Sequence, residues 1–431
     1  MKDRVENNKK RSRILLACVF CVAIFSWLAV SVVGGYIRHS QFVQEFWWDG
    51  AKDYPLNEAP TVQKRNDLIQ SLKEKVEENL MDKHPLYMDD VIFTKYIDKY
   101  FYHFSATTSS VNTKNNTADP TDLIISLETG KLAYLGDMVD YSFNVTSVVD
   151  FKQYIEKQGI SFALFMPPTK HGQADPIYQG IYEDHFDELE SSIVNELRSQ
   201  NVNVIDYSDV LKNNGEDMDG LFFATDHHWL PQVGVQACAE LGEYLNGDGF
   251  SIDTAFYNLD NYEMDYSYGP ILGSQGCKTT TAYVDKEPFP LLHPLYDSDL
   301  TVFNSRLNKT THGTIEETLY NYKELEKKSA YDKNPYGVYG YGDVALLQIH
   351  NNQKNDGKRL LVIKESFADC MTPYMCNMAE NVDVIDLRYF HGSLKSYISN
   401  NKPDIVVMIY GVSPFLNVTE KTAHEDAFDF N

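Results

Sequence analysis

Two short segments of the chain carry the residue types of nucleophilic catalysis. The first is 224–229, with the sequence ATDHHW, in which Asp226 stands two positions before His228. In a turn, such an aspartate can orient the imidazole and stabilise its protonated form. The second is 364–367 (KESF), which directly follows the apolar run 360–363. A serine after a strand presents its hydroxyl at the end of a sheet, with backbone N–H groups near a developing oxyanion.

These residues suggest a triad. A serine hydroxyl becomes a nucleophile only beside a base, and His228 can supply that base to Ser366 with Asp226 behind it. Ordinary alternatives exist for each residue, because a serine after a strand is commonly a helix N-cap and paired histidines are commonly surface residues. Asp226, His227 and His228 also suit a metal, but a further ligand cluster is missing. No Cys/His spacing is typical of zinc, so we predict no metal and no cofactor.

The surrounding pattern alternates helices with apolar strands. Continuous apolar runs separated by helices are typical of strands buried on both faces of a mainly parallel sheet. We therefore expect a three-layer α/β sandwich, in which ligands lie at the carboxyl ends of the strands. The predicted helices are 148–157, 189–200 and 233–245, and the predicted strands are 160–166, 202–205, 360–363, 382–385 and 405–409.

Domain boundaries follow from changes in this pattern. We assign the α/β domain to 121–420 and a juxtamembrane connecting region to 37–120. Within the domain, 246–340 loses periodicity and fills with Asp, Asn, Tyr and Gly. Because this stretch is too long for a plain loop, we expect an insertion with some structure of its own. A helix is expected after Ser366.

The N-terminus has the pattern of a membrane anchor. Residues 14–33 form an uncharged run of 20 residues, long enough to cross a bilayer as a helix. Lys and Arg outnumber Asp and Glu in the preceding 1–13, which favours a cytoplasmic tail. We assign the anchor to 14–36 and expect a single-pass protein of the cell membrane, with its C-terminal domain extracellular. The alternative is a cleaved signal peptide, although no small-residue cleavage site is evident.

Charge excludes one class of partner. The chain has 62 acidic and 38 basic residues, for a net charge of −24. Such a surface repels nucleic acids through its long-range field, so no nucleic acid partner is expected. The 29 tyrosines suit sugar stacking, but tyrosine is also a common core residue.

The first segment resembles a known family. Residues 225–229 (TDHHW) resemble the signature of the DHHW protein family, which is similar to the SGNH-hydrolase-like domain of the bacterial alginate O-acetylation proteins, with its motif Thr-Asp-x-His-Trp. The resemblance extends over roughly residues 120–415. Its further segments are 165–170 (FMPPTK), 336–339 (YGVY), 361–368 (LVIKESFA) and 386–390 (DLRYF).

This resemblance implies roles for individual residues. Ser366 would be the nucleophile, His228 the base and Asp226 the residue that orients the base. The family's histidine stands two positions after the aspartate, which selects His228 over His227. One departure concerns the residue before the serine, which is usually Asp in the family and is Glu365 here. The extra methylene shifts any contact made by that carboxylate.

Three further residues are candidates for substrate or oxyanion contact. Arg388 and Tyr410 stand at the ends of predicted strands, and Lys170 follows another. Each has an ordinary alternative: Arg388 as an ion-pair partner, Tyr410 as a packed aromatic residue and Lys170 as a solvated lysine.

The resemblance implies an extracytoplasmic acyl (acetyl) transferase or esterase of a bacterial cell, acting on a cell-envelope or secreted polysaccharide. The expected partners are a carbohydrate substrate, the membrane and, for a transferase, a membrane-embedded protein that supplies the acyl donor. The alternative is a non-catalytic protein that binds polysaccharide or serves as a scaffold in the cell envelope, because a fold does not fix a function.

The anchor makes a prediction about topology. Protease added to intact spheroplasts should digest the C-terminal domain and spare about the first dozen residues, because only 1–13 would be cytoplasmic. Immunoblotting with tags at both ends measures this. Protection of the C-terminal tag would contradict the orientation, and a mature N-terminus near residue 36 would support cleavage instead.

Overall fold

The computed structural model describes part of the α/β domain and one following segment. The described residues are 124–126, 131–134, 138–170, 185–279, 284–327, 330, 333–416 and 425–431. The predicted cytoplasmic tail, anchor and connecting region lie outside them. Within the described ranges, no helix combines the length and the apolar character needed to span a membrane.

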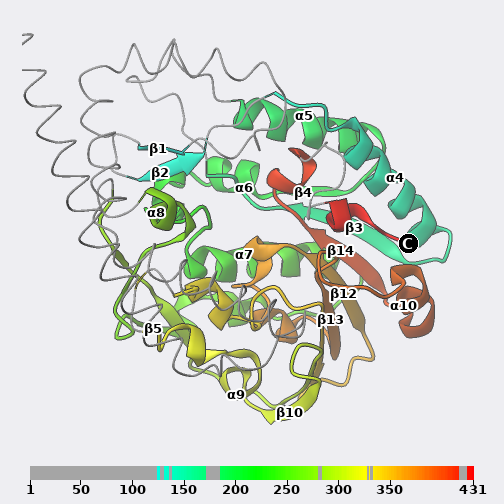
Figure 1. Ribbon diagram of the computed structural model, residues 1–431. Helices are drawn as coiled ribbons and strands as arrows, with labels where there is room; N and C mark the ends of the chain where they lie inside the picture. The colour runs from blue at the N-terminus through cyan, green and yellow to red at the C-terminus, as the bar shows by residue number, and fades with distance from the viewer. Residues whose placement is uncertain are drawn as a thin grey trace, which may run out of the picture. The chain divides into compact units, whose positions relative to one another are not determined.

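An eight-stranded sheet forms the centre of the described region (Figure 1). Its strand order is β10-β9-β11-β13-β12-β14-β3-β4. The pairings from β13 to β4 are parallel, and those from β10 to β13 are antiparallel. The strands are β3 Ser161–Met166, β4 Val204–Asp206, β9 Leu300–Asn304, β10 Lys309–Gly313, β11 Leu346–Asn351, β12 Arg359–Lys364, β13 Asn381–Ile385 and β14 Ile405–Ile409.

The apolar residues of the parallel strands belong to two hydrophobic clusters, one on each face of the sheet. On β12, Leu360 and Val362 pack in one hydrophobic cluster, whereas Leu361 and Ile363 pack in a second cluster on the other face. Strand β14 divides its residues between the two clusters in the same way. Side chains of a strand alternate between faces, so both faces of this sheet are buried. This explains why β14 and the four central residues of β12 are apolar throughout.

Helices cover both faces, as expected for three layers. On one side lie α4 Ser142–Glu156, α5 Phe186–Ser199 and α10 Leu394–Asn401, whose buried residues belong to the second cluster. On the other side lie α6 Tyr207–Asn213 and α7 Pro231–Gly247, which pack in the first cluster. Helix α7 begins with Pro231, whose fixed φ and missing N–H suit the first position of a helix.

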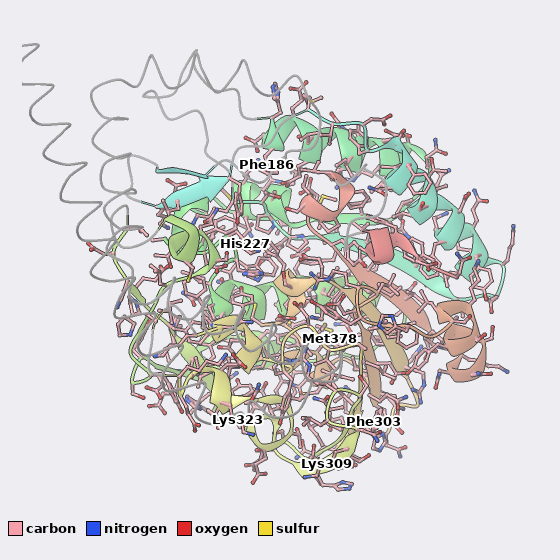
Figure 2. The ribbon with its side chains drawn as sticks, in the orientation of Figure 1. Phe186, His227, Phe303, Lys309, Lys323 and Met378 are labelled. Carbon is pink, nitrogen blue, oxygen red and sulfur yellow. The ribbon has the colours of Figure 1, made fainter. Side chains whose placement is uncertain are left out.

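The sheet is mixed, which corrects the expectation of a mainly parallel one. Strands β9 and β10 belong to this sheet although they lie in the stretch expected to be an insertion. Phe303 and Lys309, labelled in Figure 2, mark these two strands. The stretch 246–340 is therefore partly an extension of the main sheet. Antiparallel edge strands with one partly exposed face alternate polar and apolar residues, a weaker pattern than the continuous apolar run.

The remainder of that stretch forms small elements near the sheet. They include two-stranded sheets formed by β5 Tyr262–Asp265 with β8 Leu291–Pro294 and by β6 Pro270–Ile271 with β7 Glu287–Pro288. Two short helices, α8 Ser274–Thr279 and α9 Ile315–Leu319, accompany them. Before the main sheet, β1 Ile124–Ser126 pairs with β2 Leu132–Tyr134.

The helix expected after Ser366 is replaced by tight turns. The segment forms two separate 3-10 helices, η8 Ser366–Ala368 and η9 Tyr374–Asn377, with Pro373 at the boundary of the second. Proline lacks the N–H that would continue a helix through this point. Every residue from Phe367 to Ala379 is buried, so these turns are part of the core.

Candidate active site

The segment 224–229 forms a tight loop that leads into α7. An antiparallel bridge between Phe222 and Trp229 closes it, and the backbone N–H of Phe223 donates to the carbonyl of His228. Inside the loop, the Asp226 carboxylate accepts from the backbone N–H of His228 at 3.0 Å. This is an Asx-type turn, in which an aspartate side chain caps the chain two residues ahead. The turn brings the carboxylate beside the imidazole of the same loop.

The three residues of the predicted triad meet. Asp226 Oδ1 lies 2.6 Å from His228 Nδ1, and His228 Nε2 lies 2.8 Å from Ser366 Oγ, although 138 positions separate the last two residues. Ser366 is the second residue after β12, and the parallel neighbours of that strand, β13 and β14, end at the same edge of the sheet. Figure 2 labels His227, the loop residue next to His228, close to α7. Both distances lie within hydrogen-bond reach, as general base catalysis requires.

Electrostatics favour an ionised Asp226. Burial alone would raise the pKa of its carboxyl, but His228, His227 and the hydrogen bonds hold that pKa well below its usual range. Burial also opposes the charged form of His228, yet Asp226 foremost, with Glu365 and Asp369, raises the pKa of the imidazole above its ordinary value. An ionised Asp226 accepts a hydrogen bond from Nδ1–H of His228, which leaves Nε2 to face Ser366.

The second carboxylate oxygen of Asp226 also accepts a hydrogen bond. Its Oδ2 accepts from the backbone N–H of Ser274 at 2.7 Å, at the start of α8. Gly273 permits this approach, because a Cβ there would lie 2.6 Å from Oδ2 of Asp226. Both carboxylate oxygens are therefore satisfied, as a buried charge requires.

A carboxylate from a distant segment fixes the start of the loop. Glu287 on β7 accepts from the backbone N–H of Ala224 at 2.7 Å and from that of Thr225 at 2.6 Å. The Thr225 hydroxyl also donates to Glu287 and accepts from the N–H of Gly273 at 2.8 Å. The threonine of the motif thus joins the loop to the segment that caps Asp226.

Lys170 donates hydrogen bonds to the same loop. Its ammonium donates to the Asp226 carbonyl at 2.8 Å, to the Ala224 carbonyl at 3.3 Å and to Gln275 Oε1 at 3.0 Å. The side chain is buried, and desolvation lowers the pKa of Lys170 to about 7 against the pull of Asp226 and Glu287. The side chain is therefore not solvated, which contradicts the ordinary alternative for this residue, and its ammonium holds the loop.

A hydrogen bond joins the two segments that carry the candidate triad. The indole N–H of Trp229, which is fully buried, donates to the carbonyl of Phe367 at 3.0 Å. The acceptor is the residue directly after Ser366, so the tryptophan next to His228 fixes the turn that carries the hydroxyl. Glu365 caps the same turn from the other side, by accepting from the backbone N–H of Phe367 at 3.2 Å.

Aromatic rings hold the His228 imidazole. Tyr336 stacks on it with centroids 4.2 Å apart and planes 17° apart, and Phe367 packs against it at 5.1 Å. The Tyr336 hydroxyl donates to the Trp229 carbonyl. Stacked rings limit rotation of the imidazole, and their electron-rich faces favour its protonated form.

Arg388 belongs to a group of paired charges beside the site. Its guanidinium donates to Asp386 at 2.7 and 2.9 Å and to Asp343 at 2.7 Å. Lys364, the last residue of β12, pairs with Asp369 and lies 3.5 Å from Asp343. Burial raises the pKa of Asp369 to about 7 despite this lysine. The arrangement favours the ion-pair alternative for Arg388.

Tyr410 does not face a substrate. Its side chain is fully buried, and its hydroxyl donates to the Ala427 carbonyl at 2.7 Å. It packs with the second cluster, whereas Phe367, next to Ser366, packs with the first cluster on the opposite face of the sheet. The structure therefore corrects the proposed oxyanion or substrate contact in favour of a packed aromatic residue.

Among the described residues, one group has ligand atoms close enough to hold a metal ion, and it lies in this loop. Asp226, His227 and His228 place one ligand atom each within 4.8 Å of one another. However, His228 uses Nδ1 for Asp226 and Nε2 for Ser366, and His227 Nδ1 lies 2.9 Å from Ser274 Oγ. A metal at this point would break the bonds that hold the triad, so the geometry favours acid–base chemistry.

Sequence reasoning missed the residues that support the loop. Glu287 lies in an aperiodic stretch more than 60 residues away, and nothing local marks it. Trp229 and Tyr336 stand in the segments that carry the family resemblance, and this was the one available signal. Their contacts depend on how distant segments pack.

The family comparisons agree with the motif. Residues 196–385 match the family model of the DHHW protein, and residues 137–252 match that of the SGNH hydrolase-like domain of acetyltransferase AlgX. Both matches include the loop 224–229. No curated protein matches the chain.

Solved structures show the same fold at low sequence identity. A DHHW family protein from Eubacterium siraeum aligns with a TM-score of 0.54 and 17% identity, over 73% of this chain and 96% of that one. Bacillus cereus PatB1 with a sulfonyl adduct aligns with a TM-score of 0.54 and 18% identity, over 72% and 98%. At this identity the likeness concerns the fold alone.

The close approach of Gly273 to Asp226 can be tested through stability. Gly273→Ala should lower the free energy of unfolding by about 1–3 kcal/mol, because the new methyl overlaps the buried carboxylate. Gly247→Ala is the matched control, since no atom lies within 4 Å of a Cβ at that position in α7. Chemical denaturation measures both. Equal stability of the two variants would contradict the described packing.

Proposed function

We propose that this chain, a DHHW family protein with an SGNH-hydrolase-like domain, moves an acyl group, most simply acetyl, to or from a carbohydrate hydroxyl. One observation carries the proposal: the chain of hydrogen bonds from Asp226 to His228 to Ser366, at 2.6 and 2.8 Å, at the carboxyl edge of the sheet. The match to a domain described as an acetyltransferase supports the choice of an acyl group.

In the first half-reaction, Ser366 Oγ attacks the carbonyl carbon of an ester as its proton passes to His228 Nε2. Asp226 stabilises the imidazolium that forms. The tetrahedral intermediate collapses, the C–O bond to the donor alcohol breaks, and His228 returns the proton to that alcohol. The backbone N–H of Ser366 has no partner among the described residues, so it is a donor for the oxyanion.

In the second half-reaction, the oxygen of the acceptor attacks the acyl carbon as His228 takes the acceptor's proton. The bond from that carbon to Ser366 Oγ then breaks, and His228 returns the proton to Oγ. A sugar hydroxyl as acceptor makes the protein a transferase, and water makes it an esterase. Both routes restore the Ser366 hydroxyl and use the same residues. The choice depends on how well the site binds the sugar and excludes water.

The proposed setting of this reaction is the outer side of the cell membrane. An N-terminal anchor at 14–36 would hold the domain outside the cytoplasm, beside a cell-envelope or secreted polysaccharide. A transferase there needs an acyl donor, which a membrane-embedded partner would supply. The rival is a non-catalytic polysaccharide-binding or scaffold protein, and a protein of that kind needs no reactive serine.

Substitution in the triad tests the mechanism. In detergent-solubilised full-length protein, Ser366→Ala and His228→Ala should each lower kcat/KM for 4-nitrophenyl acetate by about 1,000-fold or more, because triad members act as a unit. Asp226→Asn should cost less, because the imidazole loses orientation but keeps its place. His227→Ala is the matched control and should be mildest, since its ring does not reach Ser366 Oγ in a hydrogen bond. Hydrolysis is followed by absorbance.

The order of these effects is decisive. An inactive His227→Ala beside an active His228→Ala would show that the base is misassigned. Full activity in Ser366→Ala would overturn the mechanism and favour the binding-protein alternative. Thermal unfolding of each variant confirms that a loss of activity does not come from a loss of fold.

The pH dependence gives a second prediction. His228 acts as a base only when neutral, and the charges around it raise its pKa above the ordinary value of 6.5. Activity should therefore increase with pH, and the midpoint of kcat/KM should lie above pH 6.5. Rates of 4-nitrophenyl acetate hydrolysis between pH 5 and 9, corrected for Ser366→Ala, measure it. A midpoint below 6.5 would contradict the described environment of the imidazole.

A further inference from the structure

Glu365, the residue directly before Ser366, offers the serine hydroxyl a second acceptor. Its Oε2 lies 3.2 Å from Ser366 Oγ, and His228 Nε2 lies 2.8 Å from the same oxygen. The glutamate is buried. The serine therefore stands between a base on one side and a carboxylate on the other, and the triad mechanism uses only the base.

The position of this carboxylate is fixed by the backbone. Oε2 accepts from the N–H of Phe367 at 3.2 Å, and Oε1 accepts from the N–H of Gly411 at 3.3 Å. These donors follow β12 and β14, which are neighbours in the sheet. Two backbone donors, each of which follows a different strand, hold the side chain in place. Its contact with Ser366 is therefore part of the site.

A count of protons shows what the second acceptor does. The Ser366 hydroxyl carries one proton, and Nδ1 of His228 already donates to Asp226. When His228 is neutral, Nε2 has a lone pair and the hydroxyl donates to it, which is the reactive arrangement. When His228 is protonated, Nε2–H donates to Oγ, and the serine proton is left to Glu365. The hydroxyl then accepts one hydrogen bond and donates another, and no neutral imidazole is available to take its proton.

The charge of Glu365 supports the same state. An ionised carboxylate beside the serine stabilises the nearby imidazolium, since opposite charges favour each other. Burial raises the pKa of Glu365 itself, against the pull of Arg388 and His228. Other groups also act on His228: Asp226 and the His227 ring from its own loop, Asp369 after η8, Asp343 before β11, and the rings of Tyr336 and Phe367.

We propose that Glu365 is a positioning residue, whose carboxylate holds the Ser366 proton while His228 is protonated and so moves the onset of reaction to higher pH. The inference rests on the proposed Ser366 chemistry. Aspartate at this position keeps the charge and shortens the reach.

The test is the acidic limb of the pH profile. With the full-length protein in detergent and 4-nitrophenyl acetate as the probe, Glu365→Gln should move the midpoint of kcat/KM to lower pH by about one unit, the scale of one nearby charge. Glu365→Asp should move it in the same direction but by less. Glu263→Gln, an exposed residue of β5, is the matched control and should leave the midpoint unchanged.

The outcomes separate this inference from the function on which it rests. A Glu365→Gln midpoint equal to that of the unmodified protein overturns the role of Glu365 and leaves the mechanism intact. If Glu365→Gln does not fold, the decision passes to Glu365→Asp, where an unmoved midpoint overturns the role and a lowered one supports it. Activity that persists in Ser366→Ala removes the proposed function, and the role of Glu365 with it.

Discussion

The site depends on keeping one buried carboxylate ionised and oriented. Asp226 accepts three hydrogen bonds, two from His228 and one from the backbone of Ser274. An ionised group without such partners would be costly in this environment and would take up a proton instead. The supporting contacts serve the same end: Glu287 and Thr225 fix the start of the loop, and Lys170 holds its carbonyls from below. The orientation of the His228 imidazole thus depends on residues beyond Asp226, His228 and Ser366.

The two halves of the site come from segments that are distant in sequence, and the fold joins them at several points. The indole of Trp229 reaches the turn after Ser366, and Tyr336 stacks on the imidazole while its hydroxyl bonds the Trp229 carbonyl. These contacts lie in the core on one face of the sheet, where close packing allows little displacement. The distance between His228 and Ser366 is therefore set by the packing of buried aromatic side chains.

The sequence was most informative where one physical rule dominated. Strands β12 and β14 were predictable because burial on both faces demands a continuous apolar run, and the position of Ser366 at the sheet edge follows from that. Strands β9, β10 and β11 were missed, since strands with one partly exposed face mix polar and apolar residues. The contacts of Lys170 and Tyr410 could not be predicted for a related reason. Both residues follow strands, but the direction of a side chain depends on neighbours that only the folded chain brings together.

The central claim is that Ser366 is a nucleophile activated by His228, and covalent labelling tests it most directly. The full-length protein would be treated with phenylmethylsulfonyl fluoride and digested, and its peptides would be examined by mass spectrometry. The account predicts one sulfonyl group on the peptide that contains Ser366, at a rate that increases with pH and decreases strongly in His228→Ala. Labelling at another residue, or equal labelling of Ser366 with and without His228, would contradict it.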